Sequence, residues 1–179
     1  MQHVAVVGTH EELLAGARAG DLVCFERLIE PQIRIGYRLA AAMLNDADQA
    51  EDAVQEATLR AWRSIRQLRS VGQLRPWYLT IIANRCRSMR GARWWSVIRV
   101  ADTRSGIANP ADDADQRHDL SRALGRLSPD ERAAVFLHFY EGLTSREVGD
   151  ALGVTATGAR SRIYRALQRL RVDLAEEEL

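Results

Sequence analysis

Residues 144–155 read TSREVGDALGVT, and this stretch decides the fold of the C-terminal half of the chain. Thr144 is suited to cap a helix and Glu147 completes a capping box with it, so a helix is predicted to begin there. Gly153 provides the positive φ at which a helix ends, and Thr155 is suited to cap a second helix. Two helices joined by so short a turn form a helix-turn-helix.

The second helix of this motif is predicted over residues 156–171. Its inward positions are apolar, namely Ile163, Ala166, Leu167 and Leu170. Its basic positions have no acid among them: Arg160, Arg162, Arg165, Arg169 and Arg171. A helix in the major groove needs arginines for guanine edges and phosphates, and small or polar residues near the bases. We therefore interpret 156–171 as a DNA-recognition helix; the alternative is an ordinary helical hairpin with a solvated basic face.

A strong helix start precedes this motif. Ser128-Pro129-Asp130-Glu131 places serine at the N-cap, proline at the first helical position and glutamate at the third. An all-helical unit is therefore predicted over about 118–174. Residues 91–117 contain Gly91, Asn109-Pro110 and a run of aspartates, which predicts a flexible linker.

The N-terminal half also has helical apolar spacing. Helices are predicted over 11–19, 21–44, about 48–66, and from Pro76 to about Arg90. The sequence predicts Asp21 as the cap of the second helix, a kink or break at Pro31, and Asp46 or Asp48 as the cap of the third helix. Residues 67–74 are interpreted as a loop. Since no run alternates as a strand does, the predicted fold class is all-α.

Charge is distributed unevenly along the chain. The formal net charge is +1 and every basic residue is arginine. Residues 57–101 hold ten arginines and no acid, whereas residues 1–56 hold ten acids and four arginines. All four tryptophans fall inside the acid-free segment: Trp62, Trp77, Trp94 and Trp95. Arginines interleaved with aromatic rings are typical of a surface that binds single-stranded nucleic acid. In the alternative reading Trp62 and Trp77 are core residues and the arginines are solvated; we assign Trp62 and Tyr78 to the core.

Acids begin the predicted third helix. They are Asp46, Asp48, Glu51, Asp52 and Glu56, and helical spacing puts the last four along one stripe. The stripe is either a solvated face or a docking surface for a basic partner. It lacks the glycine and the alternating ligands of a calcium loop. A metal-dependent nuclease using Asp48, Glu51 and Asp52 would lack a supporting histidine.

The remaining features favour no special chemistry. Cys24 and Cys86 match no zinc or redox spacing and are interpreted as small half-buried hydrophobes. No apolar run approaches the ~20 residues of a membrane span, and residues 1–10 lack a secretory signal. We expect a cytoplasmic protein with no membrane insertion, no metal and no cofactor.

Three segments, in this order, resemble the extracytoplasmic-function (ECF) sigma factors of the sigma-70 family. Residues 50–63 (AEDAVQEATLRAWR) look like region 2.2, and residues 75–85 (RPWYLTIIANR) look like regions 2.3 and 2.4. The motifs similar to region 4 are LSPDER at 127–132, LGV at 152–154 and RSRIYRAL at 160–167. Thr157-Gly158-Ala159 departs from the Gly-Thr-Val that is frequent in the family.

The resemblance implies two small helical domains, sigma region 2 over 21–91 and sigma region 4 over 118–174. An N-terminal extension with a first helix (1–20), a linker (92–117) and an acidic tail (175–179) complete the chain. It implies a promoter-specificity subunit without catalytic activity that recognises −35 duplex and melted −10 DNA. The implied partners are core RNA polymerase, through its β′ clamp helices and β flap, promoter DNA, and an anti-sigma factor.

The resemblance also implies roles for residues. Those expected to contact core polymerase are Asp48, Glu51, Asp52, Gln55, Glu56, Leu59 and Arg63. Those expected at the −10 element are Arg66, Gln67, Arg75, Trp77, Asn84, Arg85, Arg87 and Arg90, with the loop at about 66–74 holding a flipped base. Those expected at the −35 element are Ser145, Arg146, Thr155, Thr157, Arg160, Ser161, Arg162, Tyr164 and Arg165.

A conventional helix-turn-helix regulator with an N-terminal sensing or dimerisation domain is the main rival interpretation. It predicts binding to duplex DNA without polymerase, and it gives no reason for the arginines and tryptophans of residues 57–101. Trp94-Trp95 matches no family feature; it is interpreted as a linker anchor or as a surface for an inhibitor.

Overall fold

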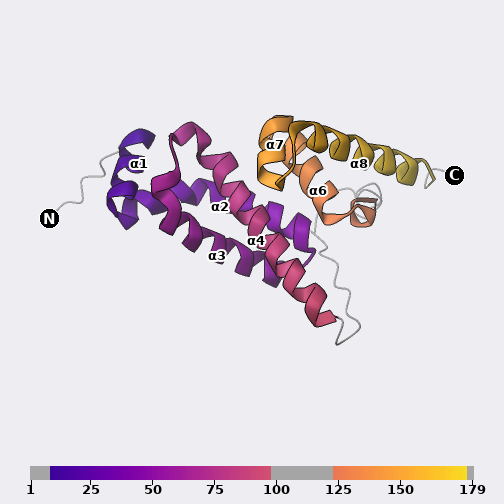
Figure 1. Cartoon of the computed structure of the whole chain (residues 1–179), viewed down its shortest axis with the longest axis horizontal. Coiled ribbons are helices and arrows are strands. Elements are labelled where there is room, and N and C mark those ends of the chain that lie inside the picture. The colour runs from indigo at the N-terminus through magenta and orange to yellow at the C-terminus, as the bar shows by residue number, and fades with distance from the viewer. Residues whose placement is uncertain (1–8, 98–122, 177–179) are drawn as a thin grey trace, which may run out of the picture.

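The structure, a computed structural model, describes residues 9–97 and 123–176, and each regular element in these ranges is a helix (Figure 1). The predicted all-α class is confirmed. The N-terminal elements are α1 (His10–Ala19), α2 (Leu22–Leu44), α3 (Ala47–Ser64), the short 3₁₀ turns η1 (Ile65–Gln67) and η2 (Val71–Gln73), and α4 (Leu74–Val97). The C-terminal elements are α6 (Pro129–Val135), the π-helical turn η3 (Phe136–Tyr140), α7 (Ser145–Leu152) and α8 (Ala156–Glu176).

Side-chain caps begin these helices where the sequence predicts them. Asp21 accepts hydrogen bonds from two backbone amides at the start of α2, and Ser128 and Thr144 form complete capping boxes at α6 and α7. Thr155 accepts from the amide of Gly158 at 3.1 Å and so caps α8. Of the two aspartates considered for α3, Asp46 is the cap, since its Oδ1 accepts from Gln49 N at 3.0 Å. Each cap satisfies amides that the helix itself leaves without partners.

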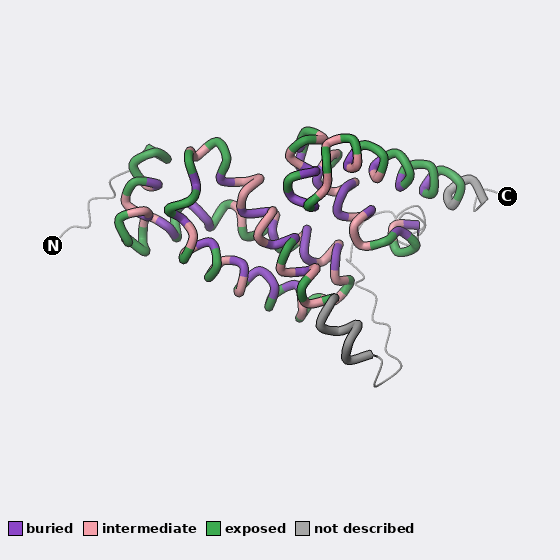
Figure 2. Tube along the Cα trace, viewed as in Figure 1, coloured by how far each residue is buried: buried purple, intermediate pink, exposed green. Residues whose placement is uncertain are grey.

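The N-terminal unit is a bundle in which α2, α3 and α4 pack on one another and α1 closes one end (Figure 1). Tyr78 is fully buried and its hydroxyl lies 2.7 Å from Thr58 Oγ1, which confirms it as a core residue. Trp62 is only half-buried, with its ring against Phe25 at 5.1 Å between centroids. Figure 2 shows the buried positions along the inward sides of these helices.

Proline 31 does not break α2, which runs without interruption through it. The buried side chains before it, Phe25 and Leu28, and those after it, Leu39 and Met43, pack into the same core. Burial of an apolar stripe on both sides of the proline holds the helix together although one backbone hydrogen bond is lost.

The helix-turn-helix is closed by two glycines. Gly153 has φ +65° and ends α7, as the sequence predicts. At Gly149 a Cβ atom would lie 2.7 Å from the carbonyl oxygen of Val154 and 3.1 Å from the carbonyl carbon of Thr155. Because both obstacles are backbone atoms, only glycine lets α7 approach the turn before α8 this closely.

Several predicted boundaries are wrong. The helix expected to stop near Arg90 continues through Gly91 to Val97, into the segment predicted as linker. A glycine inside a helix costs only ~1 kcal/mol, and no proline follows it here. The predicted loop 67–74 contains η2, and Leu167, predicted inward, is 39% exposed. The N-terminal residues 1–8, the linker from 98, the last residues 177–179 and the side chains of Trp94-Trp95 lie outside the described residues.

The two helical units pack against each other. One continuous cluster of buried apolar side chains runs from α1 to α8, and α4 lies against α7 while α2 lies against α6. Arg132 of α6 donates from Nε to the carbonyl oxygen of Ala42 at 2.7 Å, and Arg87 of α4 donates from Nη2 to the carbonyl oxygen of Ala151 at 2.9 Å. Within the described ranges, no helix has both the length and the apolarity that crossing a membrane requires.

Candidate nucleic-acid interface

Helix α8, predicted to be the recognition helix, presents a polar face to solvent. Arg160, Ser161, Tyr164 and Arg165 are exposed, and Tyr164 keeps 63% of its surface. Ala159, Ile163 and Ala166 are buried on the opposite side, which fixes this orientation. Thr155 and Thr157 are also exposed, at the N-terminal end of the helix. The structure thus brings together six of the residues predicted for the −35 element.

The other three predicted −35 residues differ in placement. Arg146 is exposed on α7, while Ser145 is half-buried at the first position of that helix. Arg162 is half-buried and turned away from the exposed face, with Nη1 3.3 Å from Asp130 Oδ2. Its guanidinium is therefore engaged by the start of α6.

The N-terminus of α7 is held by a charged cap. Glu147 Oε2 accepts from the Thr144 amide at 2.9 Å and from its hydroxyl at 2.7 Å. These hydrogen bonds, first the hydroxyl and then the amide, lower the pKa of Glu147 below its ordinary value, since both favour the carboxylate form.

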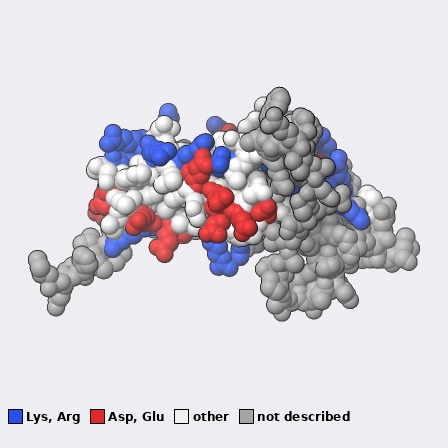
Figure 3. Space-filling view, turned by 90° about the horizontal axis from the view of Figure 1, so that it is seen from below, with Lys and Arg blue, Asp and Glu red and all other residues white. Residues whose placement is uncertain are grey.

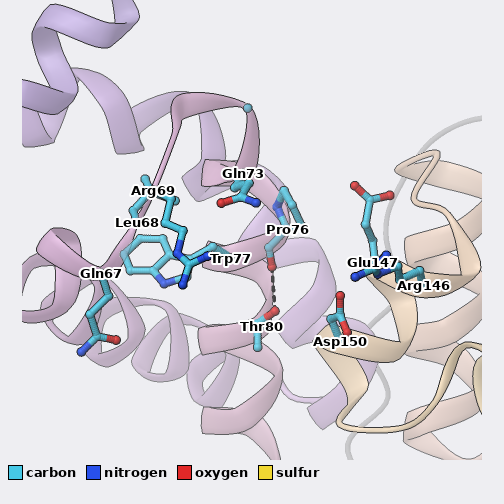
Figure 4. Close-up of a pocket in the computed structure, with 11 residues that line it drawn as sticks. Gln67, Leu68, Arg69, Gln73, Pro76, Trp77, Thr80, Arg146, Glu147 and Asp150 are labelled. Atoms are coloured by element: carbon cyan, nitrogen blue, oxygen red, sulfur yellow. Dashed lines mark hydrogen bonds between the residues drawn. The ribbon is translucent and has the colours of Figure 1, made fainter.

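A pocket of about 610 Å³ lies between the turn region 65–74 and α7 (Figure 4). The N-terminal unit contributes Gln67, Leu68, Arg69, Gly72, Gln73, Pro76, Trp77 and Thr80, and α7 contributes Arg146, Glu147 and Asp150. Trp77 is half-buried, and Figure 4 shows its ring in the pocket beside Arg69. Gln67 is exposed, and so is its chain neighbour Arg66, whose Nε donates to the carbonyl oxygen of Arg18 in α1 at 3.2 Å. An aromatic face with amide and guanidinium groups beside it can stack and hydrogen-bond an unpaired base.

Four of the five arginines predicted for the −10 element lie along α4, and each of these four is engaged within the protein. Arg85 pairs with Glu56 of α3 at 2.6 Å, and Arg75 pairs with Glu141 at the end of η3. Arg87 donates to Asn84 Oδ1 at 2.6 Å and lies 3.8 Å from Asp130 Oδ1. Arg90 lies 4.0 Å from the same oxygen. These arginines belong to residues 57–101, a segment without acids, and their acidic partners come from other parts of the chain.

Burial changes the pKa of the Arg87 guanidinium. Desolvation lowers its pKa from the ordinary arginine value, while Asp130 acts in the opposite direction. The group remains a cation at physiological pH. The half-buried guanidinium is held by its hydrogen bonds to Asn84 and to the carbonyl oxygen of Ala151, and by the nearby Asp130 carboxylate.

The acidic stripe is exposed as its spacing predicts. Asp48, Glu51, Asp52 and Gln55 point to solvent from α3, and Figure 3 shows acidic side chains gathered across one face of the molecule. Glu56, also predicted there, is half-buried and bound to Arg60 at 3.2 Å and to Arg85. Leu59 is 56% exposed and Arg63 is exposed farther along α3.

Beside the stripe is an apolar groove that sequence reasoning missed. It has a volume of about 560 Å³ and is lined from α2 by Leu22, Phe25, Glu26, Ile29, Glu30 and Ile33, and from α3 by Thr58, Leu59 and Trp62. A partial signal was present in α2, because Leu22 and Ile33 extend the apolar stripe of Phe25 and Ile29 toward both ends of the helix. Among the described residues, no group of three or more histidine, cysteine, aspartate or glutamate side chains is placed to hold a metal ion.

Comparison with known proteins matches both units of this chain. Residues 28–96 match the family model described as Sigma-70 region 2, and residues 117–170 match that described as Sigma-70, region 4. The RNA polymerase sigma factor CarQ of Myxococcus xanthus is 34% identical over 168 residues, covering 90% of this chain and 95% of its own. The ECF RNA polymerase sigma factor SigM of Mycobacterium tuberculosis is 31% identical over 168 residues, covering 91% and 85%.

A solved structure has a similar arrangement. The sigma factor RpoE of Bartonella quintana, crystallised in complex with the anti-sigma factor NepR, superposes with a TM-score of 0.76 at 26% identity. The superposition covers 84% of this chain and 96% of that one, so it includes both helical units.

Proposed function

Since the chain belongs to the ECF-type RNA polymerase sigma factors of the sigma-70 family, which direct promoter-specific initiation by core polymerase, we propose how its surfaces divide that work. The exposed face of α3 and the groove beside it bind core polymerase. The pocket at 65–74 and the arginines of α4 capture melted −10 DNA. The exposed face of α8 reads the −35 duplex. The observation that carries the proposal is the exposed polar face of α8 over a buried apolar face, a geometry suited to a major groove.

Core binding is assigned to a mixed surface. Its exposed hydrogen-bond acceptors are Asp48, Glu51, Asp52 and Gln55. Leu59, farther along the same helix, is exposed and also lines the apolar groove. A helix of the partner with basic and apolar positions on one side would meet both parts, as the β′ clamp helices would in this proposal. Arg63 lies at the edge. Glu56 is assigned a positioning role, because its carboxylate holds Arg85.

Strand capture is assigned to the pocket in Figure 4 and to the side chains near it. Trp77 stacks on an unpaired base, Gln67 contacts a base edge, and Arg66 and Arg75 neutralise phosphates. Asn84, Arg85, Arg87 and Arg90 continue this surface along α4. Those arginines bind DNA only after they leave the acids that now hold them.

The −35 element is assigned to α8 and the start of α7. Arg160 and Arg165 are placed for guanine edges, Ser161 and Tyr164 for bases or sugars, and Thr155, Thr157, Ser145 and Arg146 for phosphates. Arg162 joins them when it leaves Asp130. The β flap is the assigned partner of this unit within polymerase.

Reconstituted transcription tests this assignment. The chain is combined with core polymerase and a promoter library, and initiating sequences are selected. Specific initiation with a paired −35 and −10 preference is the expected result. A chain that binds duplex DNA equally well with and without polymerase, and directs no initiation, would support a conventional regulator instead.

We further propose control by an anti-sigma factor and action in the cytoplasm, where core polymerase is found. Support for an inhibitor comes from the Bartonella quintana sigma factor, whose arrangement with its anti-sigma factor bound is similar to that of this chain. Capture of the closed chain by such a protein would lower initiation in the reconstituted assay in proportion to the inhibitor added.

A further inference from the structure

Asp130, at the second position of α6, is surrounded by arginines from two other helices. Its Oδ1 lies 3.8 Å from Arg87 Nε and 4.0 Å from Arg90 Nη1, and its Oδ2 lies 3.3 Å from Arg162 Nη1. Arg87 and Arg90 belong to α4, whereas Arg162 belongs to α8. One carboxylate therefore joins arginines assigned to the −10 element and an arginine assigned to the −35 element.

A second acid of the C-terminal unit reaches the same surface of α4. Glu141 is 7% exposed and its carboxylate pairs with Arg75. Three of the arginines assigned to −10 DNA are thus engaged by two acids that lie far away in sequence. An anionic oxygen among guanidinium groups is what a DNA phosphate presents to the same side chains.

We propose that Asp130 is an intramolecular substitute for DNA phosphate that clasps the two DNA-binding surfaces together in the free chain, with Glu141 as a second anchor. Promoter binding then requires the clasp to open. The inference rests on the assignment of α4 and α8 to the two promoter elements made under Proposed function.

The clasped arrangement cannot engage both elements at once. The elements are named for positions about 25 base pairs apart, which corresponds to about 85 Å of straight duplex at ~3.4 Å per base pair. Arg87 and Arg162 both lie within 4.0 Å of one carboxylate, so they are a small fraction of that distance from each other. The two units must separate before each can contact its own element.

The ion pairs of Asp130 are strong enough to favour the closed arrangement of the two units and weak enough to break when DNA binds. The side chain of Asp130 keeps 32% of its surface, and those of Arg87, Arg90 and Arg162 keep 27%, 41% and 21%. Partly exposed pairs are modest individually and are weakened by salt. The apparent affinity for DNA is the intrinsic affinity reduced by the open fraction, so loss of the clasp is measurable even where the open form is rare.

The first test uses the free full-length chain and a fluorescent promoter fragment that carries both elements, with its −10 segment unpaired, selected with the reconstituted holoenzyme. Asp130→Asn is expected to bind it about five-fold more tightly than wild type, the change that follows from ~1 kcal/mol. The matched control is Glu11→Gln, which removes one negative charge from the first turn of α1. Glu11 is exposed and forms no ion pair with the described residues; its variant is expected to change affinity less than two-fold.

The same variants are then compared within holoenzyme, where the units are already apart. Asp130→Asn is expected to give wild-type promoter affinity there. An equal gain in the free chain and in holoenzyme would mean that Asp130 only repels DNA, and it would overturn the clasp, as would the absence of a gain in the free chain. Asp130→Ser repeats the series if the asparagine variant loses helical signal by circular dichroism.

Small-angle X-ray scattering tests the clasp in the absence of DNA. The double variant Asp130→Asn with Glu141→Gln is expected to have a larger radius of gyration than wild type at low salt, and wild type is expected to approach it at high salt. Equal radii at every salt concentration contradict the proposal. Wild-type holoenzyme that initiates nowhere would count against the surface assignments alone, since the scattering result does not depend on them.

Discussion

Tyr164 and Arg165 are exposed on α8, while their chain neighbours Ile163 and Ala166 are buried in the core. The same alternation of environment recurs one turn earlier, where Arg160 and Ser161 are exposed and Ala159 is buried. At the residue scale, therefore, side chains available to DNA can be changed without touching the packing that supports them. This separation makes single substitutions on α8 informative about recognition.

Arg165→Ala is expected to weaken binding to the −35 element by ~1–3 kcal/mol, the usual value of one good arginine–base contact. Binding to core polymerase should not change, because α3 is not affected. Arg171→Ala, which removes an exposed arginine near the other end of the same helix, is the matched control. Competition between −35 sequence variants on holoenzyme provides the measurement. Equal losses for both arginines would indicate that Arg165 contributes charge only.

Gly149→Ala is expected to destabilise the chain by ~1–3 kcal/mol, because the added Cβ would overlap the backbone of Val154 and Thr155. Gly125→Ala is the control, since a Cβ there meets nothing within 4 Å. That variant should be neutral or gain up to ~1 kcal/mol from helix propensity. Urea unfolding followed by circular dichroism compares the two. Equal midpoints for the two variants would contradict the close approach of α7 to the turn.

At the element scale, helix starts follow from local chemistry, and several helix ends do not. Asp21, Ser128, Thr144 and Thr155 cap the helices for which the sequence predicts them, because a cap is a contact within four residues. The end of α4 escaped prediction because Gly91 is a weak breaker that the helix absorbs. The apolar groove escaped because it forms only where α2 meets α3 in space.

The cap of α7 makes a pH-dependent contribution. Since the pKa of Glu147 is lowered on folding, its carboxylate contributes stability above the ordinary glutamate pKa, and that stability is lost as pH falls through the lowered value. Glu147→Gln keeps an acceptor for the Thr144 amide but does not titrate. Its free energy of unfolding should therefore fall less than that of wild type between pH 6 and acid conditions, as measured by denaturant titration across that range. Identical pH profiles would contradict a charged cap.

The exposed face of α3 gives a second prediction at this scale. Asp48→Arg with Asp52→Arg reverses two exposed charges and should abolish binding to core polymerase, because a basic partner would be repelled. Glu11→Arg, a reversal on the exposed first turn of α1, is the control for charge alone. Analytical size exclusion of each variant with core polymerase gives the answer. Unchanged affinity for core polymerase would mean that the acidic stripe is only a solvated face.

At the scale of the whole molecule, the packing of the two units could not be read from the sequence. The ten arginines of residues 57–101 have no acid near them in the chain, which predicts an external anion. In the structure Glu56, Asp130 and Glu141 supply much of that charge from other elements. Spacing rules describe contacts within an element, whereas these contacts depend on the tertiary arrangement.

Arg132 joins the two helical units by hydrogen bonds. It donates to the carbonyl of Ala42 in α2 and also to those of Leu124, Gly125 and Leu127 in its own unit. Arg132→Met keeps the apolar stem and removes these donors, so a loss of ~1.5–3 kcal/mol in unfolding free energy is expected. Arg171→Met provides a comparison on an exposed arginine. Equal stability of the two variants by thermal denaturation would mean that the bonds of Arg132 contribute nothing.

The apolar cluster that runs through both units makes the behaviour of the free chain depend on temperature. Separating the units exposes part of that cluster to water, so opening carries a positive heat-capacity change. Apolar attraction weakens on cooling. Cooling and high ionic strength therefore both weaken the closure of a chain that apolar packing and ion pairs hold together, and both conditions move it toward the form that spans a promoter.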